Sequence, residues 1–473
     1  MSTTRRDVLR SAVIAAVGTF PAFSSPEDVN TSLDAIVARI RRPTFPNRDF
    51  DITRYGAIGN GKEKCTEAIA KAIRECSAAG GGRIVIPEGA FLTGAIHLEN
   101  NVNLYLSKGA TLLFSRDPKD YLPNVFTRFE GTECMNYSPF VYAFEKQNIG
   151  VTGPGKLDGQ AGPDHWWPWA GKSRGGWQKG QTSGLDDRKA LVDMADRDVP
   201  VEKRIFGDGH FLRPNFVQPY RCRNVQLEDF TIVNSPMWEL NPVLCTNVIV
   251  RGITINSHGP NNDGCDPECC RDVLISNVSF STGDDCVAVK SGRNRDGRRV
   301  GVPCENVVIV DCEMKDGHGG VSIGSEVSGG IRNILTNHCH MSSPNLQRGL
   351  RIKSNSYRGG TIENIRFENV TIGQVAEATV EVDFYYEEGP GGPFKPVVRD
   401  IYIDHVTSQK SKYGIYLRGF PNDPINGVHI SDCNFENAAK GNFFEAVAQV
   451  DVKNVDVNGK PVTLQEMLST KAS

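Results

Sequence analysis

The sequence predicts an all-β fold, a single parallel β-helix, and three observations lead to it. Short segments that begin with Asn, Asp or Gly and continue with alternating apolar residues recur through the second half of the chain. They recur at intervals of roughly 20 to 40 residues, a range typical of a solenoid. Glycine accounts for 48 of 473 residues, above the usual share of about 7%, which favours many turns over long helices.

The repeats have one physical explanation. Each coil forms short strands with one apolar face, and a single coil cannot bury that face alone. Parallel stacking pairs each strand with its copy one coil away and joins the apolar faces into a continuous core. A propeller is the alternative, but its blades are longer and more even in length. The repeats begin at Asn224, Asn247, Asp272, Asn306, Asn333, Asn364, Asp400 and Gly427.

The first residues have the pattern of an export signal. The pair Arg5 and Arg6 forms a twin-arginine pattern, and an apolar stretch over 11–23 follows it. We therefore expect residues 1–25 to be a bacterial twin-arginine signal peptide, which implies an exported protein, periplasmic or extracellular. An ordinary exposed basic start is the alternative.

A linker and a cap are expected next. Residues 26–46 are predicted to be a linker with a helical stretch over 33–40. Residues 50–53 are predicted to form a strand. A helix is predicted over 66–76, because its apolar residues fall on one stripe and three glycines then end it. Residues 84–87 are predicted to form a short apolar strand.

The β-helix is expected to be one catalytic domain over 47–460, with a C-terminal tail over 461–473. A rule of about 150 residues per domain would suggest three domains, but a solenoid needs no such division. A tryptophan-rich insertion over 155–210 breaks the repeat pattern. Its tryptophans either stack on sugars or anchor the insertion on the solenoid, and the sequence leaves both readings open. They are Trp166, Trp167, Trp169 and Trp177.

Composition excludes several classes of function. The formal net charge is −3, so no global basic field attracts nucleic acid. No segment after the signal reaches about 18 consecutive apolar residues, so no membrane span is expected. The 13 cysteines are an odd number in a long chain and do not indicate a disulfide scaffold. Cys265, Cys269 and Cys270 lack a common zinc spacing, and we expect no metal and no cofactor.

Four short motifs follow the repeat strands in order. Each alone is an ordinary turn signal or a solvated strand face. In a solenoid, however, similar positions in neighbouring coils lie side by side, so we expect the motifs to share one face. Arg351 and Lys353, two apart on a strand, point to the same side. The motifs are Asn261-Asn262-Asp263-Gly264, Gly283-Asp284-Asp285-Cys286, Gly317-His318-Gly319 and Arg351-Ile352-Lys353.

Three carboxylates beside a histidine, an arginine and a lysine suit the cleavage of a glycosidic bond in an acidic sugar. Like-charged neighbours raise the pKa of a carboxyl group, so the cluster favours one protonated member. That member would protonate the departing oxygen while the other carboxylates orient and deprotonate a water. Arg351 and Lys353 would neutralise the carboxylate of the sugar.

This ordered set of motifs closely resembles the polygalacturonases, glycoside hydrolase family 28. The resemblance runs from about Phe50 to about Gly459 and includes the opening segment 50–62. It implies a right-handed parallel β-helix that hydrolyses α-1,4-linked galacturonate with inversion. One position departs from the family pattern, because Asn262 stands where the family usually has threonine. That position carries no charge, so we expect the chemistry to be unaffected.

The resemblance also implies roles for individual residues. Asp284 would be the general acid, and Asp263 and Asp285 would hold and activate water. His318 would support the protonation state of the acid and contact the substrate. The residues implied to bind substrate are Arg351, Lys353, Tyr386 and Asn261.

The expected partner is therefore an acidic polysaccharide or oligogalacturonate, and we favour exo action. The insertion over 155–210 and an arginine-rich loop over 291–299 would close one end of the cleft, and the loop arginines are either solvated or extra subsites. The alternatives are a hydrolase of another pectic polymer (rhamnogalacturonan or xylogalacturonan), a calcium-dependent pectate lyase and a non-catalytic polysaccharide-binding solenoid. The sequence leaves the oligomeric state open.

Overall fold

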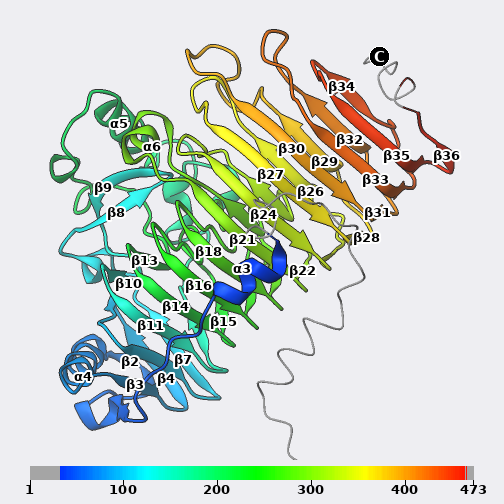
Figure 1. The fold of residues 1–473 in the computed structure, drawn as a ribbon. Coiled ribbons are helices and arrows are strands. Elements are labelled where there is room, and N and C mark those ends of the chain that lie inside the picture. The colour runs from blue at the N-terminus through cyan, green and yellow to red at the C-terminus, as the bar shows by residue number, and fades with distance from the viewer. Residues whose placement is uncertain (1–31, 464, 466–473) are drawn as a thin grey trace, which may run out of the picture.

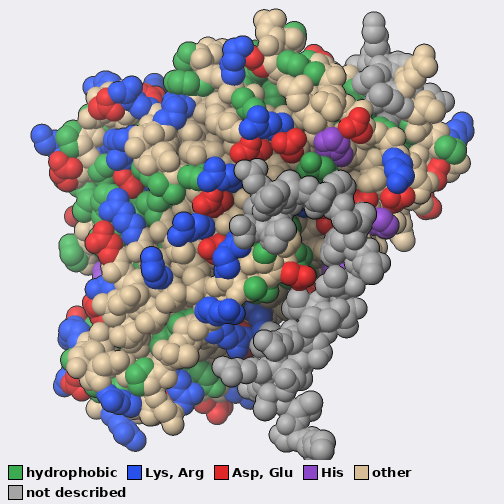
Figure 2. All heavy atoms as spheres, viewed as in Figure 1, with side chains coloured by type: hydrophobic (Ala, Val, Ile, Leu, Met, Phe, Trp, Pro, Cys, Tyr) green, Lys and Arg blue, Asp and Glu red, His purple; other side chains and the backbone are tan. Residues whose placement is uncertain are grey.

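The computed structural model describes residues 32–463 and 465, and the predicted signal peptide lies outside them. The predicted parallel β-helix is confirmed: the strands stack in parallel ladders along one axis (Figure 1). The face in Figure 2 carries interspersed Lys, Arg, Asp and Glu side chains, as the small net charge suggests. No helix among the described residues is long and apolar enough to cross a membrane.

Two ladders form the large sheet. The first consists of β1 (Asp49–Asp51), β3 (Gly82–Ile86), β6 (Val102–Leu106), β11 (Gln147–Thr152), β14 (Arg223–Glu228), β16 (Thr246–Arg251), β18 (Arg271–Ser276), β21 (Cys304–Val310), β24 (Ile331–Asn337), β27 (Thr361–Glu368), β30 (Val397–Asp404), β33 (Val428–Phe435) and β35 (Val450–Val457), with β36 (Lys460–Pro461) antiparallel at its end. The second consists of β2 (Asn60–Lys64), β4 (Gly89–Thr93), β7 (Ala110–Phe114), β12 (Lys156–Asp158), β15 (Thr231–Val233), β17 (Thr254–Ser257), β19 (Ser279–Thr282), β22 (Glu313–Met314), β25 (His340–Met341), β28 (Thr371–Ile372) and β31 (Thr407–Ser408).

A third ladder carries the site described below. It begins with β5 (Ile96–His97), β10 (Val141–Phe144) and β13 (Val217–Tyr220), and isolated bridges through Leu240 and Cys265 continue it. Its second part consists of β20 (Val287–Val289), β23 (Val321–Ile323), β26 (Arg348–Lys353), β29 (Ala378–Asp383), β32 (Tyr413–Arg418) and β34 (Phe443–Glu445).

The predicted repeats coincide with strands of the first ladder, and their first residues explain why. Asn224, Asn247, Asn306 and Asn333 adopt φ near +60°, a left-handed conformation in which asparagine is enriched. Their side chains also bond to each other between coils: Asn247 Nδ2 donates to Asn224 Oδ1 at 2.7 Å, and Asn333 Nδ2 to Asn306 Oδ1 at 3.0 Å. The asparagine therefore serves both the turn and the stacking.

The core follows from the same register. Val225, Val248, Val273 and Val307 are partners on successive strands, and each is fully buried. All 13 cysteines are free and buried, as expected of small apolar residues.

The cap largely matches the prediction. Helix α4 (Thr66–Ala78) buries its apolar stripe, and α3 (Leu33–Arg39) lies along the outside of the solenoid, where Ile36 packs against Val308 (Figure 1). The predicted strand over 50–53 is wrong in its second half. There the Asp51 side chain accepts a hydrogen bond from Thr53 N at 2.9 Å, and a 3₁₀ helix, η1 (Ile52–Tyr55), begins.

Several elements were missed. The hairpin β8 (Val125–Phe129) and β9 (Thr132–Asn136) lies beside the insertion, and the arginine-rich segment expected to be a loop forms α6 (Asn294–Val300). The insertion itself holds α5, and in Figure 1 α5, α6, β8 and β9 gather on one side of the solenoid. The remaining helices are α5 (Leu185–Asp196), η2 (Pro118–Tyr121), η3 (Trp167–Ala170), η4 (Ser173–Gly175) and η5 (Val201–Lys203).

The insertion tryptophans divide between the two readings. Trp166 is fully buried, and Trp167 donates from Nε1 to Ser235 O at 2.8 Å, so both anchor the insertion. Trp177 donates from Nε1 to Gln181 O within the insertion. Trp169 instead lines the cavity described next.

Candidate active site

A cavity of about 280 Å³ opens on the outer face of the third ladder, between that ladder and the insertion. Residues from all four motifs line it or lie directly beneath its walls. The lining residues are Phe129, Glu130, Trp169, Ala170, Lys172, Gly184, Leu185, Arg188, Phe211, Arg213, Trp238, Asn261, Asp263, Asp284, Lys290, Arg293, His318, Ser325, Glu326, Lys353, Tyr386 and Glu387.

Strand register brings the motifs together. Gly264 N donates to Asp285 O at 2.9 Å, and Cys286 N donates to Gly319 O at 2.8 Å, so the first three motifs occupy the same position on successive coils. On the next coil, Arg351 pairs with Ser322 of β23. Motifs that are far apart in sequence therefore become neighbours, as the repeat pattern predicts.

The three aspartates form a compact cluster. One carboxylate oxygen of each of Asp263, Asp284 and Asp285 lies within 4.8 Å of the others. Asp263 and Asp285 are buried, and Asp284 is partly buried. Oδ1 of Asp263 and Oδ1 of Asp285 have no hydrogen-bond partner among the described residues. These two buried oxygens therefore have unused hydrogen-bonding capacity.

His318 is the partner of Asp284. Its Nδ1 lies 2.8 Å from Asp284 Oδ1, and its Nε2 lies 3.2 Å from Arg174 Nη1. Because a carboxylate only accepts, Nδ1 of His318 is the donor in the contact with Asp284. Burial opposes ionisation of Asp284, but the hydrogen bond and the electrostatic field of His318, followed by the charge of Lys353, outweigh it and hold the Asp284 pKa well below its usual value.

Arg351 and Lys353 lie on the other side of the cluster. Lys353 Nζ donates to Asp285 Oδ2, and Arg351 Nη1 lies 3.8 Å from Asp285 Oδ1. Burial opposes ionisation of Asp285, yet the charge of Lys353 keeps its pKa low. The Tyr386 ring lies 5.4 Å from the Arg351 guanidinium and 5.5 Å from Lys353 Nζ. Both implied cations and the implied tyrosine thus form one wall.

The pKa values of two aspartates in the cluster shift in opposite directions. Burial, together with the neighbouring charges of Asp266 and Asp284, raises the pKa of Asp263 well above its usual value. Within the cluster the pKa of Asp263 is therefore raised, whereas that of Asp284, the expected acid, is lowered. The cause is local: Asp284 receives a hydrogen bond from His318, but Asp263 receives none at Oδ1.

Sequence reasoning missed Lys290, which lies beneath the cluster. Its Nζ is 3.7 Å from Asp263 Oδ2, 3.5 Å from Asp266 Oδ2 and 3.3 Å from Glu326 Oε2, and the side chain is 3% exposed. It also lies 4.5 Å over the Trp238 ring. A lysine directly after the apolar run Val287-Ala288-Val289 was the available signal, because such a position is seldom charged without a buried partner.

The two asparagines of the first motif have different surroundings. Asn262 is fully buried, accepts from Ser257 Oγ and Gly259 N at 2.7 Å each, and donates to Ser235 O at 3.0 Å. The departure from the family pattern is thus accommodated by backbone and hydroxyl groups away from the carboxylates. Asn261 lines the cavity, and its Oδ1 accepts from Arg213 Nη2 at 2.8 Å.

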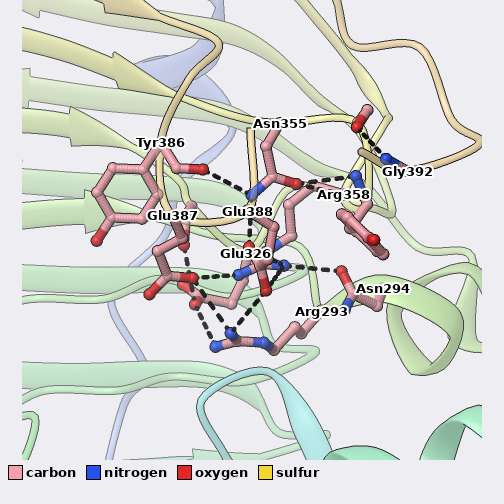
Figure 3. Close-up of polar contacts among 12 residues, drawn as sticks. Arg293, Asn294, Glu326, Asn355, Arg358, Tyr386, Glu387, Glu388 and Gly392 are labelled. Carbon is pink, nitrogen blue, oxygen red and sulfur yellow. Dashed lines mark hydrogen bonds and ion pairs between the residues drawn. The ribbon is translucent and has the colours of Figure 1, made fainter. Parts of the chain in front are cut away.

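The arginine-rich segment is largely neutralised by carboxylates. Figure 3 shows Arg293 and Arg358 directed at Glu387 and Glu388, from the loop after β29. Arg293 also lies 3.1 Å from Glu130 of the hairpin turn. Arg295 pairs with Asp198 and Arg299 with Glu133, while Arg298 stacks on Phe394. These contacts tie α6, the hairpin and the loop after β29 into one wall of the cavity.

Two groups in the described part of the chain have a geometry that could hold a cation. One is the aspartate cluster itself, and the other is Asp404, His405 and Asp432 on the surface. In the aspartate cluster, the ammonium groups of Lys290 and Lys353 already supply positive charge. Lysine side chains of the protein therefore supply positive charge to the aspartate cluster.

Comparison with known proteins gives a consistent result. Residues 208–458 match the model of the glycosyl hydrolases family 28. The crystal structure of a hyperthermoactive exopolygalacturonase from Thermotoga maritima superposes with a TM-score of 0.88 at 45% identity, covering 90% of this chain and 95% of that chain. An exo-poly-alpha-D-galacturonosidase of Dickeya chrysanthemi is 28% identical over 92% of this chain and 78% of its own. A probable polygalacturonase of Vitis vinifera is 27% identical over 82% and 74%.

Proposed function

This chain belongs to family 28 of the glycosyl hydrolases, and we propose that it hydrolyses α-1,4 bonds between galacturonates, acting at a chain end. The observation that carries the proposal is the aspartate cluster lying against Arg351 and Lys353 in one cavity. The carboxyl groups supply acid and base, and the two cations supply the counter-charge for a uronate.

In this proposal Asp284 is the general acid. It gives its proton to the departing glycosidic oxygen as the bond to the anomeric carbon breaks. A water held by Asp263 and Asp285 attacks that carbon from the opposite face and gives up its proton to a carboxylate, which produces inversion. Asp263 Oδ1 and Asp285 Oδ1, which have no hydrogen-bond partner among the described residues, support the water-binding role.

The low pKa of Asp284 is compatible with this role, because bound substrate changes the electrostatic field around it. The charge of Lys353 contributes to keeping Asp284 ionised. A uronate carboxylate bound to Lys353 and Arg351 offsets that charge, so substrate binding raises the pKa of Asp284. Asp263 lies next to it and brings a proton into the cluster. We propose that the acid becomes protonated in the complex with substrate.

Exo action is supported by how the cavity is enclosed. The insertion contributes Trp169, Leu185 and Arg188 to its wall, and the hairpin turn contributes Glu130. The ion pairs of Arg188 and Arg293 with Glu130 fix these segments against the solenoid. A wall on this side of the cavity limits the passage of a polymer and favours binding of a chain end.

Product analysis tests the proposed function. The purified protein is incubated with polygalacturonate and with trigalacturonate, and products are separated by anion-exchange chromatography. Galacturonic acid released from the first minutes, with little loss of viscosity, is expected. A rapid viscosity drop with mixed oligomers would reject exo action, and a product absorbing as an unsaturated uronate would reject hydrolysis.

We further propose that the chain is exported through its twin-arginine segment. The support is Arg5 and Arg6 followed by the apolar stretch over 11–23. Replacing both arginines with lysine in a bacterial host should retain the protein in the cytoplasm. Unchanged export of that variant would reject this part of the proposal.

A further inference from the structure

Arg213 is a buried arginine without a carboxylate partner. The residue is only 3% exposed. Nη1 donates to Pro236 O at 2.9 Å and to Pro260 O at 2.6 Å, and Nη2 donates to Asn261 Oδ1 at 2.8 Å. Among the residues the structure describes, no Asp or Glu forms an ion pair with it. Its charge is thus met only by neutral oxygens.

The other buried arginines of the described chain are built differently. Arg128 lies 2.8 Å from Glu268, Arg204 lies 2.8 Å from Asp296, Arg293 lies 3.1 Å from Glu130, and Arg358 lies 2.7 Å from Glu387. A buried charge is costly unless an opposite charge accompanies it. Each of these four arginines has a carboxylate partner, and Arg213 has none among the described residues.

Arg213 also has unused donors. A guanidinium carries five N–H groups, and the three hydrogen bonds account for three of them. The Nε–H and one Nη2–H remain without a partner among the described residues. In the same protein, Arg83 binds Asp49 with Nε and Nη2 at 2.8 and 2.7 Å. Arg213 therefore retains donors of the type that binds a carboxylate in a fork.

The position of Arg213 places it at the proposed active site. Arg213 lines the cavity together with Asp263 and Asp284. It belongs to the coil before Pro236, and its guanidinium reaches the turn that carries Pro260 and Asn261. It thus approaches the aspartate cluster from the N-terminal side of the solenoid, whereas Arg351 approaches from the C-terminal side, on β26.

The charge of Arg213 persists at neutral pH. Burial lowers its pKa to about 10, and the fields of Glu130, Asp263 and Asp284 only partly offset that effect. An anion bound at Arg213 would supply the missing counter-charge.

We propose that Arg213 binds the carboxylate of the terminal galacturonate, the sugar enclosed by the insertion, while Arg351 and Lys353 bind that of the adjacent sugar across the scissile bond. The proposal rests on the proposed function and extends it. Two cationic positions, one on each side of the aspartate cluster, match a bond that joins two uronates. A methyl ester on the terminal sugar would leave Arg213 without a counter-charge, so the enzyme requires a free acid there.

The test compares trigalacturonates that carry one methyl ester, either on the terminal sugar or on the adjacent sugar, with the free acid. Arg213→Gln removes the charge, Arg213→Lys keeps it without the fork, and Lys353→Gln is the matched control at the other position. We expect the wild type to prefer the free acid over the terminal ester by about 100-fold in kcat/KM. Arg213→Gln should reduce that preference to below about 10-fold, with the lysine variant between.

Lys353→Gln should instead reduce the preference at the adjacent sugar and leave the terminal preference intact. If Arg213→Gln slows all three substrates by the same factor, Arg213 only braces Asn261 and the inference is overturned. Should Arg213→Gln fail to fold, Arg213→Lys tests the inference by the same ratio of kcat/KM for the free acid to kcat/KM for the terminal ester. A wild type that cleaves none of these substrates would reject the proposed function. In that case calorimetry would still test the inference by comparing the affinity for galacturonate with that for galactose in the wild type and in Arg213→Gln. A preference for galacturonate that Arg213→Gln leaves unchanged would overturn it.

Discussion

Lys290→Met should reveal how the buried charges under the cavity are balanced. Lys290 Nζ lies between 3.3 and 3.7 Å from carboxylates of Glu326, Asp266 and Asp263. Removing one partner of a buried ion pair costs about 3–5 kcal/mol, because the other charge remains buried. Methionine fills a similar volume and can still pack on Trp238, so most of the loss is electrostatic.

The pH dependence separates charge from packing. Burial opposes ionisation of Glu326, but Lys290 and Arg293 outweigh it and hold its pKa low. A depressed carboxyl pKa stabilises the fold above the unfolded value, about 4.5, and this stability is lost as pH falls through the folded value. Without Lys290 the folded pKa of Glu326 rises, so that loss begins at higher pH. The acid-unfolding midpoint should therefore move upward.

The assay is urea unfolding at pH 7 and acid unfolding, both followed by tryptophan fluorescence. Lys64→Met is the matched control, because Lys64 pairs with Asp120 at the surface, where the side chain of Lys64 is 51% exposed. Such a pair contributes about 1 kcal/mol or less. Equal destabilisation of the Lys290 variant at every pH would show that lost packing, and not charge, is responsible, and would refute the reasoning.

Three further predictions concern the acid, the cation and the asparagine ladder. Asp284→Asn should fold normally and lower kcat by about 100- to 10,000-fold, the range of general acid catalysis; near-native turnover would contradict the assignment. EDTA should leave the rate on polygalacturonate unchanged, since Lys290 and Lys353 already balance the aspartate charge; loss of activity restored by calcium would favour a lyase. Asn306→Ala should cost about 2–4 kcal/mol, because alanine tolerates φ +58° poorly and two ladder bonds are lost. Asn306→Gly should recover the part of this free energy that comes from the backbone conformation, as measured by urea unfolding. Equal destabilisation by the alanine and glycine variants would rule out a backbone contribution.

The solenoid could be predicted because its signal is repeated. Asn224, Asn247 and Asn306 each mark a turn and a ladder contact, so one local rule recurs on every coil. The strand register then brings Asp263 and Asp285 together without any further information. The repeat pattern therefore predicted both the fold and the proximity of the motifs.

The enclosing wall could not be predicted in the same way. Arg293 and Arg299 resemble a solvated basic loop, because their partners Glu130 and Glu133 lie far away in the chain. No periodic pattern records such pairs, and α6 packs against both the hairpin strand β9 and helix α5. The helix is therefore a consequence of tertiary contacts and not of local propensity.

The same reasoning explains why the proton assignment needed coordinates. The sequence indicated that three carboxyl groups would lie close together. It did not indicate which of them would lack a hydrogen-bond donor. His318 donates to Asp284, and Lys353 donates to Asp285, which leaves Asp263 with the least stabilised anion. Substrate acts on this balance through the cations it covers. In the proposed function, a uronate bound at Lys353 would weaken the stabilisation of the Asp284 anion and so favour protonation of the proposed acid.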